Sequence, residues 1–385
     1  MAFRQTVFVV ITLLISTLPH QGAGITVGLF YGREGQSVVF STVEGEYLLT
    51  ANGRQVAVIR QGDIFHIELT PSGLEVHDTL QSYGVFKNLE FKGVSGDNIF
   101  QVKPVFPALP AKESEDILYI SLFNDALMLI NRLSLEKYIP GTVEAEGGSN
   151  AGIEYYKAQA VLTRTFAVKN FYRHAHEGFN LCDGVHCQAF NGKSRMNAKI
   201  YAAVSATQDE TLTDRTNTPI VAAYHANCGG ITGNASIEWN RDLPYLSPVR
   251  DPFCVKSEHH SWIKNITLAD WNIYLQKKGY FGEPENLYST IETGRQKYLD
   301  RANNRLLLTE IRTDQKLKSS FFHVEPGNGS VTLRGHGYGH GLGMCQEGAM
   351  EMARVGYTYM DILMFYFHSV KITRNQSPVQ PIPVP

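Results

Sequence analysis

Two acidic residues stand in a largely apolar run just before an expected helix. Glu144 and Glu146 fall in the segment from Tyr138 to Ser149, and the helix is expected to begin at Ile153. Burying a carboxylate in an apolar core is costly, so both residues are candidates for general acid or base chemistry. The alternative is electrostatic, since a carboxylate near the start of a helix complements the helix dipole.

A glycine-dense segment between Gly335 and Gly348 is the second candidate. Glycine recurs at nearly every second position there, with His336, Tyr338 and His340 between. Glycine lets a backbone approach a ligand closely, which favours a binding role. The segment is not a phosphate loop, because it lacks the Gly-Lys-Ser/Thr ending of that motif and follows no βαβ unit.

Histidines and cysteines gather after the expected helix, and their spacing can supply four ligands to Zn²⁺. The pattern is His-Ala-His at 174–176, followed by Cys182, His186 and Cys187. In an exported protein, a Cys182–Cys187 disulfide is the alternative. The spacing alone leaves both interpretations open.

Residues 1–23 have the three parts of a secretory signal. Arg4 supplies a positive end, Val7 to Leu18 is apolar, and a Pro-containing segment ends at Ala23. The apolar run is shorter than the about 20 residues of a membrane span, although an uncleaved anchor is the alternative. We therefore expect a secreted or periplasmic protein of the cell envelope, without a stable membrane span, in a compartment that permits disulfides.

The elements that must position these residues change character along the chain. Short runs rich in Val, Ile, Phe and Tyr predict strands from Ile25 to about Glu90, and another pair over 117–133. The clearest helix begins at Ile153, because apolar residues recur there with a period near 3.6 and no glycine or proline follows until Gly178. Further helices are expected over 196–206, 266–278, 346–355 and 360–367, and a strand over 220–225.

This order predicts an α+β fold with a β-rich N-terminal part. The expected units are a signal peptide (1–23), a β-rich domain (24–112), a mixed α/β domain (113–373) and a Pro-rich tail (374–385). The chain has 35 basic and 37 acidic residues, a formal charge of −2. Such a balance, without a run of Lys or Arg, argues against a nucleic-acid partner.

Several separated blocks resemble, in the family's order, the stage II sporulation protein D family (SpoIID/LytB). They are YIPGTVEAEGG, YYKAQAVLTRTFAV, HCQAF, AYHANCGGIT, DLPYLSPVRDP and RGHGYGHGLGMCQEGAM, and the likeness covers residues 117–370. The resemblance implies a peptidoglycan lytic transglycosylase or an amidase enhancer. It also implies that residues 113–373 form a SpoIID-like catalytic domain with a substrate cleft.

The resemblance assigns roles to particular residues. The family's essential acid falls on Glu146, with Glu144 the less favoured position. The implied structural zinc ligands are His176, Cys182, His186 and Cys187, with His174 as the alternative histidine. The implied substrate-binding residues are Tyr338, His340, Gln346, His336 and Gly343.

Two positions depart from the family pattern. Members usually have Met-Pro after the acid, where this chain has Gly147-Gly148, and Arg or Lys where His336 stands. The first departure bears on the pose of Glu146. The second bears on contact with acidic groups of the substrate.

The reaction implied by the resemblance needs a single carboxylate. The 6-hydroxyl of N-acetylmuramic acid attacks its own C1 and forms a 1,6-anhydro ring, with the advantage of a tethered nucleophile. Glu146 would protonate the leaving O4 of N-acetylglucosamine and then accept the proton of the 6-hydroxyl. It must start protonated, and an apolar wall that would raise its pKa is offered by Tyr138, Ile139, Pro140 and Val143.

The remaining cysteines fit an exported protein. Cys228 and Cys254 flank a loop and are predicted to form a disulfide, which would close about 27 residues and contribute roughly 3 kcal/mol. Cys345 is left over as a free, buried thiol. A nucleophilic pair of Cys345 with His340 is disfavoured, because neighbours five apart in a glycine-rich loop are poorly placed for it.

The expected partners are peptidoglycan glycan strands, in particular peptide-free ones, and a cell-wall amidase. A non-catalytic glycan-binding module that enhances such an amidase is the alternative function, motivated by Gly147-Gly148. A metal-dependent hydrolase is a third, motivated by the cysteine and histidine pattern.

Overall fold

The computed structural model describes residues 24–374 except 34, 95, 196, 289–293, 301 and 304. The expected signal peptide and nearly all of the Pro-rich tail lie outside the described residues. No helix among the described residues has the length and apolar character needed to cross a membrane.

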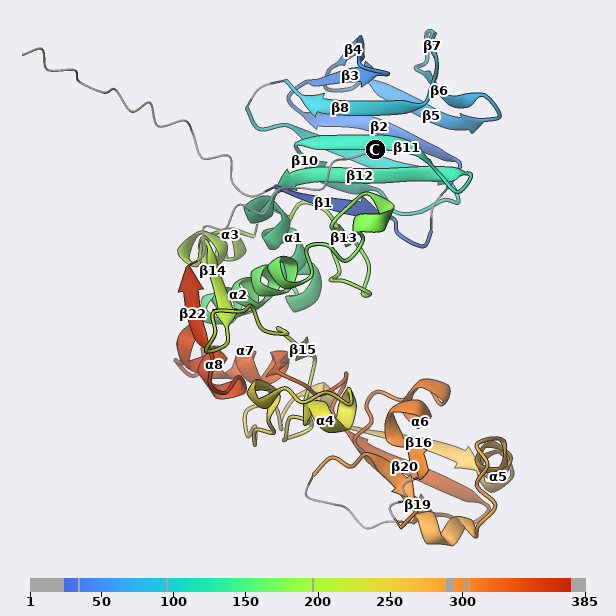
Figure 1. Ribbon diagram of the computed structural model, residues 1–385, viewed down its shortest axis with the longest axis vertical. Helices are drawn as coiled ribbons and strands as arrows, with labels where there is room; N and C mark the ends of the chain where they lie inside the picture. Colours follow the sequence, from blue (N-terminus) through green and yellow to red (C-terminus); the bar gives the residue numbers. More distant parts are fainter. Residues whose placement is uncertain are drawn as a thin grey trace, which may run out of the picture.

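Two antiparallel sheets form a sandwich at the N-terminal end of the described chain (Figure 1). The seven-stranded sheet has the order β13 (Leu181–Cys182), β1 (Gly24–Leu29), β12 (Ala126–Ser134), β11 (Ile117–Phe123), β8 (Asn88–Gly93), β3 (Tyr47–Ala51) and β4 (Arg54–Ile59), with β13 parallel to β1. The six-stranded sheet has the order β10 (Lys112–Glu115), β9 (Ile99–Phe106), β2 (Ser37–Glu44), β5 (Ile64–Thr70), β6 (Gly73–His77) and β7 (Ser82–Phe86).

Alternating burial explains how the two sheets pack. Every second residue of β2 is buried, as expected for a strand with one face on the core. Phe40 of β2 stacks on Phe91 of β8 with ring centroids 4.1 Å apart, which joins the two inner faces. The boundary expected near residue 112 falls inside this sandwich, because β10 pairs with β9 and β12 pairs with β1.

A helical layer follows the sandwich and surrounds α2 (Ile153–Lys169), which is buried along most of its length. Its neighbours are α1 (Leu135–Gly147), α3 (Ala198–Ala206), α7 (Gln346–Arg354) and α8 (Tyr359–Tyr366). Two short pairings close this layer, β14 (Glu210–Thr213) with β22 (Lys371–Arg374) and β15 (Tyr224–His225) with β21 (Met344–Cys345). The expected strand over 220–225 is therefore reduced to its last two residues.

A small lobe lies at the far end of the molecule from the sandwich (Figure 1). It contains β16 (Ser261–Thr267), α5 (Leu268–Lys277), β17 (Tyr298–Asp300), β18 (Arg305–Leu307), α6 (Leu308–Asp314), β19 (Phe322–Pro326) and β20 (Ser330–His336). The lobe has its own hydrophobic core around Trp271, separate from the main core. The remaining elements are the short α4 (Ala235–Glu238) and four 3₁₀ turns, at Ala175–Glu177, Pro244–Leu246, Glu258–His260 and Pro284–Leu287. The predicted α+β fold is confirmed.

Candidate active site

Glu144 and Glu146 lie inside a helix, α1, and not before the start of one as predicted from the sequence. Ser134 begins α1 by accepting a hydrogen bond from the Lys137 N–H, so the helix starts well upstream of both glutamates. Gly148 ends it with φ +71°, a left-handed conformation that favours glycine. The helix-start interpretation of the carboxylates is therefore wrong, and Glu146 belongs to the last turn of α1.

Two distant segments hold Glu146 in place. The Ala189 N–H donates to its Oε1 at 2.6 Å, and the Gln346 side chain at the start of α7 donates to its backbone carbonyl at 3.0 Å. Burial raises the pKa of the Glu146 carboxyl, while the Ala189 hydrogen bond and the Tyr224 hydroxyl act in the opposite direction. The negative end of the α1 dipole also disfavours ionisation at this position.

A buried chain of polar groups continues from Glu146. Gln188 donates from its amide nitrogen to the Tyr224 hydroxyl at 3.0 Å and accepts from the Tyr138 hydroxyl at 3.4 Å. Because the Tyr224 oxygen accepts this bond, its proton is available to the Glu146 carboxylate. Tyr224 and Gln188 are not among the site residues predicted from the sequence, although both lie in blocks that resemble the family, AYHANCGGIT and HCQAF.

A hollow of about 630 Å³ opens in front of Glu146. Among the described residues that line it, Glu146 is the one carboxylate. Three cations, Lys169, Arg173 and Arg241, also line the hollow, beside the aromatic rings of Tyr224, Trp239 and Phe166. Its size lies in the range of small-molecule sites. Glu144 does not line it and instead accepts a hydrogen bond from the Arg195 N–H at 2.8 Å.

The substrate-binding residues expected from the glycine-rich block separate into two groups. His340 lines the hollow, and Gln346 contacts the backbone of Glu146. Burial and the charges of two arginines lower the pKa of His340 to about 4, so the ring is neutral at pH 7. Tyr338 and His336 are absent from the described lining of the hollow; Tyr338 packs against His259, with ring centroids 5.1 Å apart.

The glycines of this block let its backbone lie close to other segments of the protein. A Cβ on Gly343 would lie 2.1 Å from the Ala223 carbonyl oxygen, and one on Gly341 would lie 2.3 Å from the Arg295 guanidinium carbon. Both residues also have positive φ angles, of +67° and +80°. The block therefore packs closely on the segment that carries Tyr224, and Gly343 contributes to the site through this packing.

The expected zinc ligands converge, with one exchange of histidine. His174, Cys182, His186 and Cys187, here called the His/Cys cluster, offer donor atoms that all lie within 4.8 Å of one another. Cys187 Sγ is 3.4 Å from His174 Nε2, and Cys182 Sγ is 3.8 Å from His186 Nδ1. The Glu177 carboxylate lies 2.6 Å from His174 Nδ1 and leaves Nε2 free to bind a metal, as metal-bound histidines commonly require. The donor set fits Zn²⁺.

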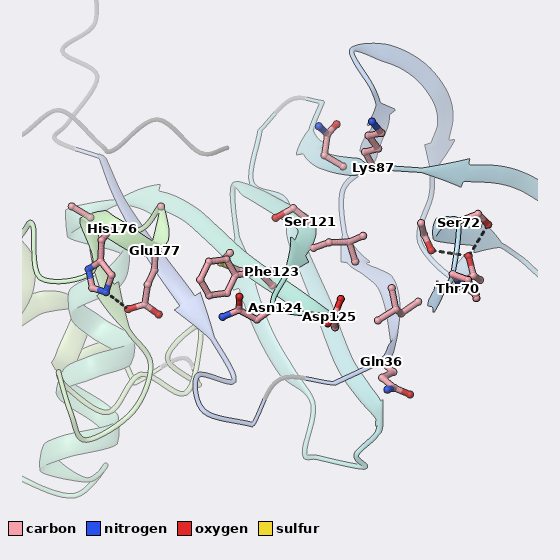
Figure 2. Close-up of a pocket in the computed structure, with 18 residues that line it drawn as sticks. Gln36, Thr70, Ser72, Lys87, Ser121, Phe123, Asn124, Asp125, His176 and Glu177 are labelled. Atoms are coloured by element: carbon pink, nitrogen blue, oxygen red, sulfur yellow. Dashed lines mark hydrogen bonds and ion pairs between the residues drawn. The ribbon is translucent and has the colours of Figure 1, made fainter.

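His176 does not belong to this cluster. Its side chain is 77% exposed and lies 3.4 Å from the Glu177 carboxylate, on the rim of a separate hollow (Figure 2). His174 is buried, because its ring packs on Phe179 with centroids 4.8 Å apart. The structure thus favours the alternative, His174, over His176. The separate hollow is lined partly by strands of the sandwich, and Glu146 is not among its described lining residues. It is therefore not part of the candidate active site.

The predicted Cys228–Cys254 disulfide is not formed in the structure. Both cysteines are free thiols, with Sγ atoms 3.4 Å apart, and a third thiol, Cys345, lies beside them with Asp251. Cys345 is free and buried, as expected. The pair is therefore part of a four-residue group, which the sequence could not indicate because its members are spread over more than a hundred residues.

The chain is similar to one family model and to several known proteins. A family model described as "Stage II sporulation protein" matches residues 124–213. The stage II sporulation protein D of Bacillus subtilis is 29% identical over 303 residues, covering 72% of this chain and 87% of that protein. An uncharacterised protein of Brachyspira hyodysenteriae is 29% identical, covering 65% of this chain and 69% of its own length. The amidase enhancer of B. subtilis is 24% identical, covering 61% of this chain and 40% of that protein. Over much of its length, this chain is similar to stage II sporulation protein D, and the family model matches its residues 124–213.

Proposed function

We propose that this protein acts on the bacterial cell wall as an exported lytic transglycosylase, which cleaves the bond between N-acetylmuramic acid and N-acetylglucosamine. The observation that carries the proposal is the single carboxylate at the hollow. Ordinary glycoside hydrolysis uses two carboxylates, one as acid and one as base or nucleophile. Glu146 has no such partner among the described lining residues, which favours a reaction that needs one.

The substrate itself supplies the nucleophile in such a reaction. The 6-hydroxyl of N-acetylmuramic acid forms a bond to its own C1 as the bond from C1 to the leaving O4 breaks. The product carries a 1,6-anhydro ring, and no water enters. Because the nucleophile is tethered, its effective concentration is large, and a single side chain suffices for both proton transfers.

Glu146 is prepared to begin as the acid. Burial holds its pKa above the ordinary range, which keeps a larger fraction protonated. It would donate its proton to O4 and then accept the proton of the 6-hydroxyl. The Ala189 N–H and the Tyr224 hydroxyl face the carboxyl and would stabilise the carboxylate between the two transfers.

The other lining residues suit an amino-sugar chain. N-acetylmuramic acid carries a lactyl carboxylate, and Lys169, Arg173 and Arg241 offer positive charge at the hollow. Trp239 offers a flat aromatic surface for a sugar ring. Neutral His340 can donate from Nε2, because its Nδ1 accepts the Leu342 N–H at 3.0 Å.

A zinc ion in the His/Cys cluster would be structural. His174, Cys182, His186 and Cys187 would fill all four positions of a tetrahedral site and leave none open for catalysis. The bound ion would crosslink the loop that follows α2. Cys187 stands two residues before Ala189, so this crosslink would fix the N–H that contacts Glu146.

The proposal is tested with purified protein and two substrates, glycan strands with and without stem peptides, whose products are identified by mass. We expect strands to be shortened and each new muramic end to carry the 1,6-anhydro ring. Products with ordinary reducing ends would indicate a hydrolase and contradict the proposal. The comparison of the two substrates shows whether peptides must first be removed.

A second candidate function is that of a non-catalytic glycan-binding enhancer of a cell-wall amidase. The similarity to an amidase enhancer favours it, as does Gly147-Gly148 after the acid. It predicts that the protein is pulled down with glycan, cleaves none of it, and binds equally well with Glu146→Gln. The structure gives Gly147 a local reason, since a Cβ there would lie 2.6 Å from the Tyr155 hydroxyl.

A further inference from the structure

Four buried donor residues form a second cluster, and all of them follow the His/Cys cluster in the sequence. Cys228, Asp251, Cys254 and Cys345, here called the Cys/Asp cluster, offer donor atoms within 4.8 Å of one another. All four residues are buried, at most 1% exposed. None of them lines the hollow of Glu146, so the proposed transglycosylase reaction leaves them unexplained.

Two distances within this cluster are slightly shorter than the edges of a metal tetrahedron. With Zn–S bonds of about 2.3 Å, two thiolates on a tetrahedral Zn²⁺ stand about 3.8 Å apart, and a sulfur and a carboxylate oxygen slightly less. Cys228 Sγ lies 3.4 Å from Cys254 Sγ and 3.3 Å from Asp251 Oδ2. Small outward movements of the donors would admit the ion.

The carboxylate of Asp251 has no cation to neutralise it among the described residues. Its recorded partners are neutral donors: the Phe253 N–H at 2.9 Å, the Tyr366 hydroxyl at 2.9 Å and the Cys228 thiol. A buried carboxylate without a positive partner is costly. A divalent cation would satisfy all four groups together.

We propose that Cys228, Asp251, Cys254 and Cys345 bind a second structural Zn²⁺. The three thiols would lose their protons to solvent on binding, and the four ligands would leave no open position. The surroundings can stabilise the excess negative charge of such a site. The Cys228 N–H donates to Cys345 Sγ at 3.3 Å, and the Arg295 guanidinium donates to the Cys228 carbonyl at 3.0 Å.

This site would join three segments, two of which carry the residues that contact the acid, Tyr224 and Gln346. Cys228 follows β15, which carries Tyr224, and Cys345 immediately precedes Gln346. Cys254 belongs to the loop after residue 250 and is held by the Asn227 side chain, which donates to its carbonyl at 3.2 Å. The inference goes beyond the proposed function and does not depend on it, because it concerns metal content and not cleavage.

The test measures zinc in the full chain, purified with zinc and without added reductant or chelator. We expect about two zinc ions per chain in the wild type, and about one in each of two matched double variants, Cys182→Ala with Cys187→Ala and Cys254→Ala with Cys345→Ala. In the first variant, Co²⁺ in place of zinc should give a thiolate-to-cobalt charge-transfer band and tetrahedral d–d bands. Asp251→Asn should shift those d–d bands.

A measurement on the wild type covers the case in which the second double variant does not fold. The native protein is treated with an alkylating reagent before and after metal removal under denaturing conditions without reductant, and the cysteine peptides are read by mass. Because burial alone protects these thiols in the native protein, the supporting result is that denaturation releases about two zinc ions per chain and that Cys228, Cys254 and Cys345 are all recovered as thiols. Recovery of Cys228 and Cys254 as a disulfide-linked pair would overturn the proposal, as would a wild type that binds a single zinc ion lost with Cys182 and Cys187.

Discussion

The His/Cys cluster and the Cys/Asp cluster contact the same glutamate through different neighbours. The first ends at Cys187, two residues before the N–H that reaches the Glu146 carboxylate. The second ends at Cys345, one residue before the side chain that reaches the Glu146 backbone. Their surroundings differ, because His186 is exposed and lines the hollow, whereas the whole Cys/Asp cluster is buried.

This difference suggests two roles: the His/Cys cluster positions the acid, and the Cys/Asp cluster supports the fold. Loss of the His/Cys cluster should release the loop that carries Ala189, while most of the core stays intact. The Glu146 carboxylate would then lose the hydrogen bond from the Ala189 N–H. Loss of the Cys/Asp cluster should free β15, β21 and the start of α7 together, and so weaken the helical layer. The predictions below test that distinction, beginning with the largest effect.

The largest effect is expected on stability when the Cys/Asp cluster is removed. Cys254→Ala with Cys345→Ala should lower the free energy of unfolding by about 4 kcal/mol, because loss of a bound metal is among the most damaging single changes to a fold. Denaturant unfolding of this variant and of the wild type measures it. An unchanged unfolding midpoint would show that this cluster does not support the fold.

Removal of the His/Cys cluster should act on activity more than on stability. Cys182→Ala with Cys187→Ala should reduce glycan cleavage by about 100-fold, since a shift of about 1 Å in a positioning group costs that much. Its unfolding midpoint should fall less than that of Cys254→Ala with Cys345→Ala. The distinction between the clusters fails if the two variants lose activity and stability in the same proportion.

The Tyr224 hydroxyl should have a smaller effect on the same reaction. Tyr224→Phe removes the group that accepts from Gln188 and faces Glu146, and we expect kcat to fall about tenfold with KM nearly unchanged. Tyr357→Phe, at a partly exposed tyrosine outside the described lining of the hollow, is the matched control. An equal loss in both variants would remove Tyr224 from the mechanism.

The smallest effect is a change in the pH dependence of stability. Because folding raises the pKa of Glu146, this carboxyl favours the folded state below its unfolded pKa, and that contribution is lost as pH rises through the folded pKa. Glu146→Gln should therefore be more stable than the wild type at neutral pH, by ~1 kcal/mol or less, and equally stable near pH 3. A destabilised Gln variant at pH 7 would contradict a raised pKa.

The sequence predicts elements with a regular local pattern, and it predicts residues that lie in a family motif. The helix from Ile153 is confirmed, and no glycine or proline interrupts it. Glu146 lines a hollow in the structure. The sequence predicts the strands but not the whole sandwich, since β11 and β12, beyond residue 112, belong to the sheet that contains β1.

The rest depends on contacts that no local pattern records. His174 and His176 differ by two residues, and only packing against Phe179 shows which ring is buried. Asp251 joins three cysteines, and Tyr224 joins Glu146, across distances in the chain that spacing arguments do not reach. The sequence predicts a helix over 266–278, but the separate core of the small lobe around Trp271 appears only in three dimensions.

The central claim is that Glu146 alone carries out both proton transfers. Its most direct test compares Glu146→Gln with Glu144→Gln, a matched change two residues away on the same helix and outside the hollow. Both variants are incubated with peptide-free glycan strands, and the 1,6-anhydro ends are counted by mass. We predict that Glu146→Gln forms at least about 100-fold fewer of these ends than the wild type, while Glu144→Gln forms nearly as many. Full activity of Glu146→Gln, or an equal loss in both variants, would contradict the account.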